Sequence, residues 1–281
     1  MKKWLWTAGV LLVVALVAYQ YRLYIFVAIN QPQMFTSPSF DTQPPELPAM
    51  SGELKILAIS KTNSYRHAAI PDASAMLQAI TDERGWSIFQ TENAAVFNPN
   101  DLGKFDLVVL NNATGRLFTA DQEAAFVAFV ENGGGVVGIH AAGDSSQEWD
   151  WYISELIRAR FTGHPMQQHL QQATLTVEDT SHPATRHLDA TWIRGDEWYN
   201  FVASPRGRVN VLISIDETTY DPESGPMGDD HPMVWWHEVG KGRVFYSALG
   251  HTTESYSDAA MRTMITQAMA WAARQERGAI R

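Results

Sequence analysis

The stretch that most constrains this chain runs from residue 131 to 144 and reads Glu-Asn-Gly-Gly-Gly-Val-Val-Gly-Ile-His-Ala-Ala-Gly-Asp. Its first glycines end a helix, a short apolar strand follows, and the strand delivers His140 into a loop of small residues. A continuous apolar strand is buried on both faces, which is typical of parallel sheets covered by helices. Ligands bind at the carboxyl ends of such strands. The segment therefore predicts a parallel α/β sheet with a functional residue at position 140.

The neighbouring segments repeat this rhythm of strand and helix. Pro71 starts a predicted helix that Gly85 ends, and Thr119 with Gln122 forms the capping box of a second helix. After Asp144 the pattern becomes less regular, and the last helix is expected over 257–274. The predicted strands cover 54–60, 86–91, 106–111, 135–140, 173–178, 209–216, 233–239 and 243–249, with a further helix over 149–160. We expect one α/β domain over 53–276, a doubly wound and mainly parallel sheet with a partly antiparallel C-terminal half.

Charge and composition exclude several classes of function. The chain has no cysteine, which removes disulfides, thiolate metal sites and a cysteine nucleophile. Three of the 21 basic residues lie in the first 29 positions, which contain no acid, so the remainder carries 18 basic against 31 acidic residues, about −13. A surface of this charge repels phosphate backbones. We therefore expect no nucleic acid partner.

The N-terminal 29 residues differ from the rest of the chain. Lys2 and Lys3 precede a long apolar stretch that is interrupted by Arg22. About 20 apolar residues cross a bilayer as a helix, and the flanking lysines favour a cytoplasmic N-terminus. We expect residues 1–29 to be a membrane anchor, with a cleaved signal peptide as the alternative. The proline-rich residues 30–52 are expected to form an extended linker, and the domain is expected outside the cytoplasmic membrane, in the periplasm or the extracellular space.

Polar side chains gather where the predicted strands end. Because the carboxyl ends of parallel strands share one edge of a sheet, the residues that follow them are expected to lie together. Residues in the less regular insertions could fold over the same edge. The first group contains His67, Asn111, His140, Asp144, His251 and Glu254, and the second contains His164 and Glu197.

This set of residues permits two kinds of chemistry. Two or three imidazoles with a carboxylate form the ligand set of a catalytic zinc or a similar divalent ion, for which His140, His164 and His251 are the candidates. Without a metal, the same groups support general acid–base catalysis, with His140, Asp144, Glu197 and His251 as the candidates. A serine hydrolase would have to use Ser145 or Ser146, which lack the position of a nucleophile elbow.

Aromatic side chains beside acids suggest a sugar site, because sugar rings stack on aromatic faces while carboxylates bind hydroxyl groups. Trp198 and Tyr199 follow the acidic pair Asp196-Glu197. A solvated acid pair beside a core tryptophan is the alternative interpretation. The predicted substrate-binding residues are Arg66, His67, Asn111, Trp198, Tyr199 and Glu254.

The order of these motifs resembles the ThuA-like (trehalose utilisation) family, whose fold is similar to that of class I glutamine amidotransferases without the catalytic cysteine. The resemblance covers nearly all of 53–275 and leaves the N-terminal segment outside. The matching segments are Tyr65-Arg66-His67, residues 133–142, Phe161-Thr162-Gly163-His164-Pro165, residues 179–185, Asp196-Glu197-Trp198-Tyr199-Asn200-Phe201 and residues 250–256.

The resemblance implies a role in carbohydrate metabolism. The expected activity is that of a metal- or histidine-assisted hydrolase, lyase or isomerase, acting on a small-molecule sugar such as a disaccharide or an oxidised glycoside. The alternative is a non-catalytic domain on a degenerate amidotransferase fold, which binds a sugar or a protein.

Overall fold

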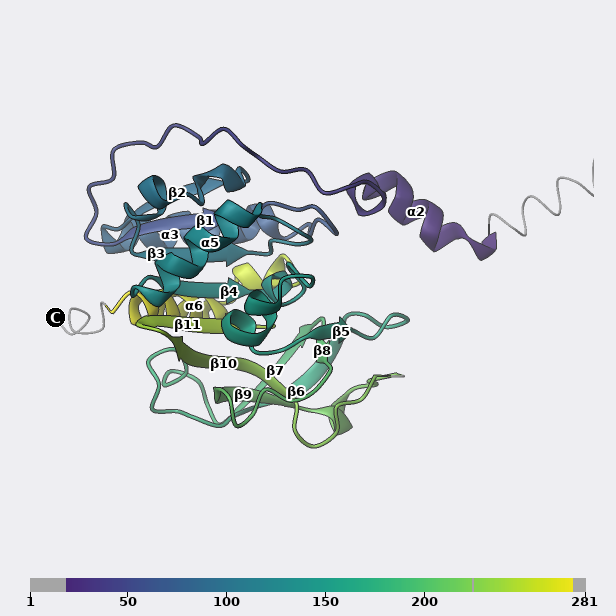
Figure 1. Ribbon diagram of the computed structural model, residues 1–281. Helices are drawn as coiled ribbons and strands as arrows, with labels where there is room; N and C mark the ends of the chain where they lie inside the picture. The colour runs from purple at the N-terminus through teal and green to yellow at the C-terminus, as the bar shows by residue number, and fades with distance from the viewer. Residues whose placement is uncertain (1–18, 224, 275–281) are drawn as a thin grey trace, which may run out of the picture.

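A computed structural model describes residues 19–223 and 225–274 of the chain (Figure 1). The centre is a nine-stranded sheet with the order β2-β1-β3-β4-β11-β10-β9-β6-β7. Strands β2, β1, β3, β4 and β11 are parallel, and from β11 onward each neighbouring pair is antiparallel. The predicted mainly parallel α/β sheet with an antiparallel C-terminal half is confirmed. The strands are β1 (Lys55–Ile59), β2 (Ser87–Thr91), β3 (Leu107–Asn111), β4 (Gly135–Ile139), β6 (Gln171–Val177), β7 (Thr191–Asp196), β9 (Asn210–Asp216), β10 (Pro232–Val239) and β11 (Gly242–Ser247).

Helices cover both faces of the parallel half. Their ends follow the residues that the sequence indicated: Gly85 takes φ 67° after α3, and Thr119 forms the capping box of α5 with Gln122. Helices α3 and α6 lie side by side, where Arg262 and Glu83 form an ion pair of 2.7 Å. The helices are α2 (Arg22–Asn30), α3 (Ile70–Arg84), α4 (Pro99–Leu102), α5 (Ala120–Glu131) and α6 (Ala259–Ala272). The short 3₁₀ turns are η1 (Pro32–Phe35), η2 (Ala94–Val96), η3 (His140–Gly143), η5 (Glu217–Thr219) and η6 (Glu254–Tyr256).

The helix predicted over 149–160 is a π-helical turn, η4 (Tyr152–Ile157), that ends in Arg158 at φ 62°. Two side chains of β10 donate hydrogen bonds to backbone carbonyl groups of this turn. Trp235 donates its indole N–H to Ile157 and His237 donates to Glu155, at 2.9 and 2.8 Å. In a regular α-helix these carbonyl groups would accept backbone hydrogen bonds instead. The apolar periodicity of the segment does not show that side chains from another strand bond to them.

Three further strands were not predicted. Strand β7 (Thr191–Asp196) lies at the edge of the large sheet, and its sequence mixes a glycine with two charged residues, which weakens any strand signal. A separate two-stranded sheet joins β5 (Phe161–Gly163) to β8 (Asn200–Phe201). Strand β7 and this small sheet carry residues of the site described below.

The predicted anchor lies mostly in residues 1–18, outside the described part of the chain. Within the described residues, no helix is both long enough and apolar enough to cross a membrane. The proline-rich segment is attached to the domain at several points. The side-chain amide of Gln31 donates to the carbonyl of Arg66 through its nitrogen and accepts the backbone N–H of Arg66 through its oxygen. Asp41 forms an ion pair with the buried Lys61 at 2.6 Å.

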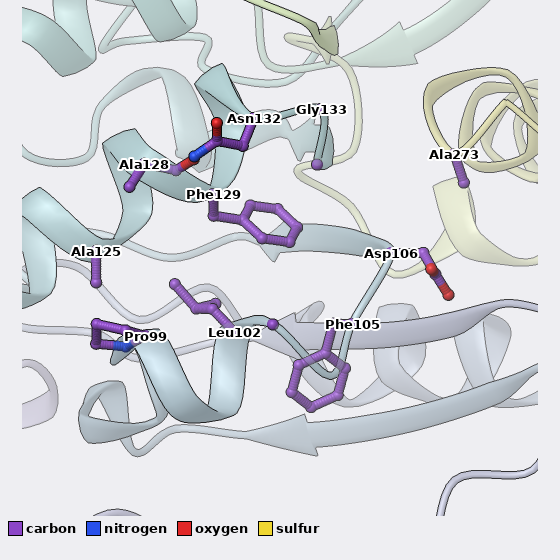
Figure 2. A pocket seen from close by; sticks show the side chains of 12 residues that line it. Pro99, Leu102, Phe105, Asp106, Ala125, Ala128, Phe129, Asn132, Gly133 and Ala273 are labelled. Atoms are coloured by element: carbon purple, nitrogen blue, oxygen red, sulfur yellow. The ribbon is translucent and has the colours of Figure 1, made fainter.

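A cavity of about 490 Å³ lies at the amino ends of the parallel strands, between α4, α5 and the end of α6 (Figure 2). Its walls are mainly apolar, with Leu102, Phe105 and Phe129 among them. Asp106, the single ionisable residue among the described residues that line it, accepts the backbone N–H of Lys55.

Burial of His237 makes the stability of the fold depend on pH. Its low exposure, assisted by the nearby Arg158 charge, lowers the pKa of the His237 imidazole to about 3. Since the unfolded chain binds this proton near pH 6.5, its contribution to stability is complete above that pH and is lost as the pH falls toward 3. Between pH 7 and pH 5, this one group removes about 2 kcal/mol of unfolding free energy.

We therefore expect His237→Gln, which keeps an N–H for Glu155, to reduce the difference in unfolding free energy between pH 7 and pH 5 by about 2 kcal/mol. Urea unfolding at both pH values measures the difference. The exposed His187→Gln serves as the matched control and should leave it unchanged. An unaltered pH dependence in His237→Gln would contradict the assignment.

Candidate functional site

Four loops meet at the carboxyl edge of the sheet. They follow β1, β4, β11 and β7, and they carry His67, His140, His251 and Glu197. Strand β7 runs in the same direction as the parallel strands, because four antiparallel pairings separate it from β11. Its carboxyl end therefore points to the same edge. The sheet coils far enough that Asp196, the last residue of β7, reaches the backbone of Gly250 and His251.

His140 sits in a sharp turn at the end of β4. Its backbone is left-handed, with φ 45°, a conformation that costs energy for a residue other than glycine and marks functional sites. Two buried tyrosines hold the turn: Tyr246 donates to the carbonyl of His140 at 2.9 Å, and Tyr152 donates to that of Ala142 at 2.6 Å. Gly143 is required here, because a Cβ at this position would lie 2.0 Å from the Tyr246 hydroxyl.

The four side chains converge on one point. One ligand atom from each of His67, His140, Glu197 and His251 lies within 4.8 Å of all the others. Three of these atoms form a tighter triangle: His140 Nε2 lies 3.3 Å from Glu197 Oε2 and 3.2 Å from His251 Nδ1, and Glu197 Oε2 lies 3.0 Å from His251 Nδ1. His67 packs edge-on against both imidazoles, with ring centroids 4.9 and 5.0 Å away.

The hydrogen bond at Nδ1 of His140 determines that its other ring nitrogen, Nε2, carries the lone pair that faces the cluster. Nδ1 lies 2.7 Å from the carbonyl oxygen of Ala248 and must donate to it. In the neutral ring Nε2 is then an acceptor, and it points at a carboxylate and a second imidazole nitrogen. Two atoms with lone pairs, His140 Nε2 and Glu197 Oε2, therefore lie 3.3 Å apart with His251 Nδ1 beside both, and a proton on His251 Nδ1 or a cation between the three atoms stabilises the arrangement.

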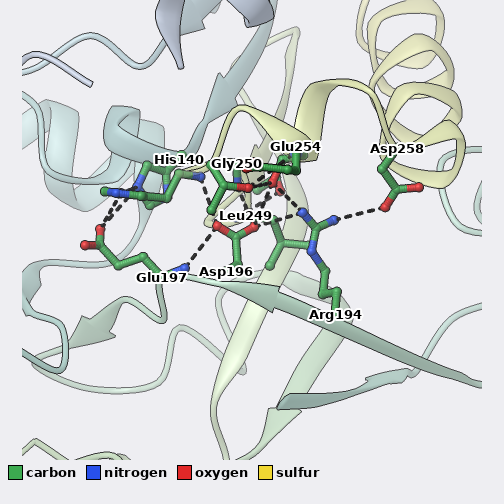
Figure 3. A network of polar contacts seen from close by, with 12 residues as sticks. His140, Arg194, Asp196, Glu197, Leu249, Gly250, Glu254 and Asp258 are labelled. Atoms are coloured by element: carbon green, nitrogen blue, oxygen red, sulfur yellow. Dashed lines mark hydrogen bonds and ion pairs between the residues drawn. The ribbon is translucent and has the colours of Figure 1, made fainter. Parts of the chain in front are cut away.

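A second network behind the cluster places its members (Figure 3). The fully buried Asp196 accepts the backbone N–H groups of Glu197, Gly250 and His251 at 2.9 to 3.0 Å. It also pairs with Arg194 at 2.9 Å, and Arg194 donates to Ser255 at 2.7 Å. The network joins β7 to the loop after β11, and so fixes the distance between Glu197 and His251.

The electrostatics of the cluster favour an ionised carboxylate. Burial by itself raises the pKa of Glu197, but hydrogen bonds and positive charge from His140 and His251 outweigh it and hold this pKa far below its usual range. For His251, burial lowers the pKa, yet the hydrogen bond and charge of Glu197 produce a net rise. His67 has no such partner, so burial and the neighbouring imidazoles lower its pKa.

Of the predicted metal ligands, the structure brings His140 and His251 into the cluster. It places His164 behind Glu197, with His164 Nδ1 3.3 Å from the other carboxylate oxygen, Oε1. Asp144 lies near enough to feel the charge of Glu197, and burial together with that charge raises the pKa of Asp144 to about 7. Asp144 is thus a carboxyl group that can give or take a proton near neutral pH.

The predicted sugar-binding residues are dispersed. Tyr199 contacts the site, with its ring 4.3 Å from that of His140, whereas Trp198 is fully buried beside Tyr220. Asn111 is buried and donates to Ser74. The remaining two residues are Arg66, which forms a bidentate ion pair with Glu92, and the exposed Glu254 at the start of η6.

Sequence reasoning considered Asp196 only as one acid of a sugar site, and it gave no role to Arg194 or Tyr65. Asp196 and Arg194 form the network described above. Two opposite charges two residues apart on an edge strand do not predict such a network from the sequence. Tyr65 marks the solvent-facing side of the cluster, which we call its mouth: it is 37% exposed, and its ring lies edge-on to His67. Burial and the charge of Glu197 raise the pKa of its hydroxyl, so that it stays protonated and able to donate.

Neither candidate serine has the geometry of a nucleophile. Ser145 is fully buried and donates to the carbonyl of Gly115, and Ser146 is 2% exposed. Among the residues that the structure describes, no imidazole hydrogen-bonds to either hydroxyl. The site therefore offers histidine and carboxylate chemistry, without an activated serine.

Asp196→Ala should destabilise the protein by about 3–5 kcal/mol, because it leaves the buried guanidinium of Arg194 without its carboxylate. Urea unfolding measures the loss. The control is Glu83→Ala, which removes an exposed ion pair and should cost less than about 1 kcal/mol. Equal effects of the two substitutions would contradict the role of Asp196.

Similarity to known proteins extends over most of the chain. The family model described as ThuA, trehalose utilisation, matches residues 55–272. No curated protein matches the chain. Among solved structures, a protein described as ThuA-like from Bacteroides uniformis ATCC 8492 is 23% identical, with a TM-score of 0.67, over 82% of this chain and 95% of that one.

Two more solved structures share the fold. A protein described as ThuA-like from Parabacteroides merdae ATCC 43184 is 21% identical, with a TM-score of 0.64, over 79% of this chain and 90% of that one. A cytoplasmic protein from Salmonella typhimurium LT2 is 12% identical, with a TM-score of 0.55, over 78% of this chain and 99% of that one. Because the family model spans most of the chain, including all four residues of the cluster, the chain belongs to the ThuA (trehalose utilisation) family.

Proposed function

We propose that His67, His140, Glu197 and His251 bind a divalent transition metal ion. The observation that carries this proposal is the triangle of donor atoms, whose sides measure 3.0, 3.2 and 3.3 Å. Ligands about 2.0–2.1 Å from a tetrahedral zinc ion are about 3.3 Å apart. The three donor atoms thus have the spacing of one face of a zinc coordination sphere.

The surroundings of the donor atoms fit a metal as well. The bond from His140 Nδ1 to the Ala248 carbonyl is the kind of outer contact that orients a metal-binding histidine and fixes its tautomer. His67 Nδ1 is buried and has no hydrogen-bond partner among the described residues. A ring with one unpaired nitrogen beside this triangle of atoms supplies a fourth ligand or a group that bonds to a metal-bound molecule.

Three imidazoles with one carboxylate favour zinc or a neighbouring transition metal over magnesium or calcium, which prefer oxygen ligands. A bound ion of this kind polarises a carbonyl group and lowers the pKa of bound water. The residues of the chain would divide the remaining work. His164 steadies the second oxygen of Glu197, Tyr65 donates a hydrogen bond from the mouth, and Asp144 accepts or returns a proton near neutral pH.

For the substrate we propose a sugar, as a disaccharide or an oxidised glycoside, on which the protein acts as a hydrolase, lyase or isomerase. The family supports a role in carbohydrate use. A carbonyl group on an oxidised sugar would match a site built from a cation and a proton-transferring carboxyl group, because both act on enolisable carbonyl compounds. The rival is a domain that binds a sugar or a protein without turnover.

We also propose that the N-terminal segment anchors the protein in the cytoplasmic membrane, with the domain on the outer side. The sequence supports this: Lys2 and Lys3 precede an uncharged run from Trp4 to Tyr21.

Metal binding can be tested without knowledge of the substrate. Protein stripped with a chelator and dialysed against zinc or cobalt should retain a single ion per chain by elemental analysis. Loss of a residue that only orients a metal ligand lowers metal affinity roughly 10–100-fold. Loss of a ligand should cost more, so His140→Ala and Glu197→Gln should each lower the affinity for the metal by more than this. In cobalt-loaded protein, visible absorption bands of a tetrahedral site should disappear in both variants.

The control for these variants is His187→Ala, an exposed histidine whose ring lies against the carbonyl of Ala260. It should bind metal as the parent protein does. If the parent and His187→Ala retain no more metal than the two cluster variants, the metal hypothesis is wrong.

Activity forms a separate prediction. Disaccharides and their oxidised derivatives are first screened by thermal shift, since a ligand that binds the native state raises Tm. With the sugar so found, His140→Ala should lower kcat by about 10²–10⁴-fold, the range for a group that transfers protons or holds the reacting centre, while Tm stays near that of the parent. Binding without any turnover in the metal-loaded parent would favour the rival binding domain.

A further inference from the structure

Exposed apolar side chains gather beside the mouth of the site on two segments that are far apart in the sequence. The first segment comprises α2 and η1, and the second is the loop of residues 164–170 after β5. Together we call them the apolar rim. Its exposed large side chains are Tyr19, Tyr21, Tyr24, Ile25, Phe26, Ile29, Met34, Phe35, Met166 and Leu170, with exposed fractions between 41% and 72%.

Both segments are fixed next to the cluster. The side chain of Gln33 donates to the carbonyl of Ser64, and Gln31 bonds to both backbone groups of Arg66, one residue before the cluster residue His67. Tyr24 packs edge-on against Phe35 at 5.2 Å, which joins α2 to η1. The apolar rim therefore begins immediately beside the mouth.

The second segment is held in the same way. The Glu223 carboxylate accepts the backbone N–H groups of Met166, Gln167 and Gln168, at 2.8 to 3.2 Å. This carries Met166 outward, with 70% of its surface exposed. At the inner end of the loop His164 contacts Glu197, and the ring of His169 lies 5.9 Å from that of His251. In Figure 1, α2 and this loop project toward the same side of the molecule.

Charge distinguishes this face from the rest of the protein. The domain is strongly acidic, yet residues 23–40 contain no charged residue, and neither do residues 161–177 apart from two histidines. Before Asp41 the chain has no acid at all, while it carries Lys2, Lys3 and Arg22.

The part of the rim on α2 and η1 is uncharged apart from Arg22 and is rich in aromatic side chains, which suits the interface of a bilayer. The loop of residues 164–170 adds Met166 and Leu170; the acids beside it are Asp221 and Glu223, and the Glu223 carboxylate is bonded to three backbone N–H groups of the loop. Acidic surface elsewhere on the domain would be repelled by anionic lipids.

We propose that the apolar rim docks on a lipid bilayer and turns the mouth of the histidine cluster toward the membrane surface. This goes beyond an anchor, which would tether the domain without orienting it. The occupant is lipid rather than a second copy of the chain, because the rim continues directly into the uncharged run from Trp4 to Tyr21. Substrate would then reach the site along the membrane surface.

The absence of cysteine makes a clean test available. Single cysteines are introduced into the full chain as Phe26→Cys, Met166→Cys and Leu170→Cys, with Glu131→Cys at the amino edge of the sheet as the matched exposed control. Each is labelled with a fluorophore, and the protein is reconstituted into phosphatidylcholine–phosphatidylglycerol vesicles. Paired vesicles contain or lack a phosphatidylcholine spin-labelled near its headgroup, which quenches probes at the bilayer surface.

The proposal predicts that the probes at positions 26, 166 and 170 lose at least half of their emission in the spin-labelled vesicles, while the probe at 131 keeps its emission. Quenching at 26 without quenching at 166 and 170 would show an anchor with a freely oriented domain, and would overturn the proposal. Equal quenching at 131, or an emission change that follows protein density in unlabelled vesicles, would also overturn it. The readout needs neither metal nor turnover, so its outcome is independent of the proposed metal site and activity. It rests on the proposed anchor, and the absence of quenching at 26, 166 and 170 alike would overturn both the anchor and the docking.

Discussion

The site depends on one buried carboxylate, that of Asp196. This side chain has no exposed surface and accepts three backbone N–H groups and a guanidinium hydrogen. Removing a charge from water is expensive, and the bonds to Arg194 and the backbone must offset that cost. These bonds hold the edge strand β7 against the turn that carries His251, although β7 is far from β11 in the order of the sheet. Without this tie, Glu197 would have no reason to face the imidazoles.

The parts of the fold that the sequence predicted are those with local and repetitive signals. Apolar strands of five residues, Pro71 and Gly85 around a helix, and the capping box at Thr119 each act within a few residues. The edge at which His140 and His251 meet follows from the parallel order of their strands. Glu197 and His67 were placed only loosely, because their positions depend on how far the sheet coils and on how a loop packs. Neither quantity leaves a periodic trace in sequence.

The errors have physical reasons of the same kind. The segment 149–160 has helical periodicity, but Trp235 and His237 of β10 donate hydrogen bonds to its carbonyl groups, so a π-helical turn forms instead. Trp198 beside an acid pair suggested a sugar platform, yet it is fully buried, and the aromatic ring at the site is that of its neighbour Tyr199. Adjacent residues on an extended segment point to opposite sides. Composition alone does not show which of the two faces the site.

The N-terminal segment also helps to position His67, one residue of the cluster. His67 has no hydrogen bond at Nδ1 to hold its ring, so its position depends on the loop from residue 61 to 67. That loop is tied from outside by the Asp41–Lys61 ion pair and by Gln31 and Gln33. A proline-rich segment suits this work, because its limited conformational freedom lowers the entropy lost when it is laid along the domain. Residues 31–41 thus also support one wall of the site.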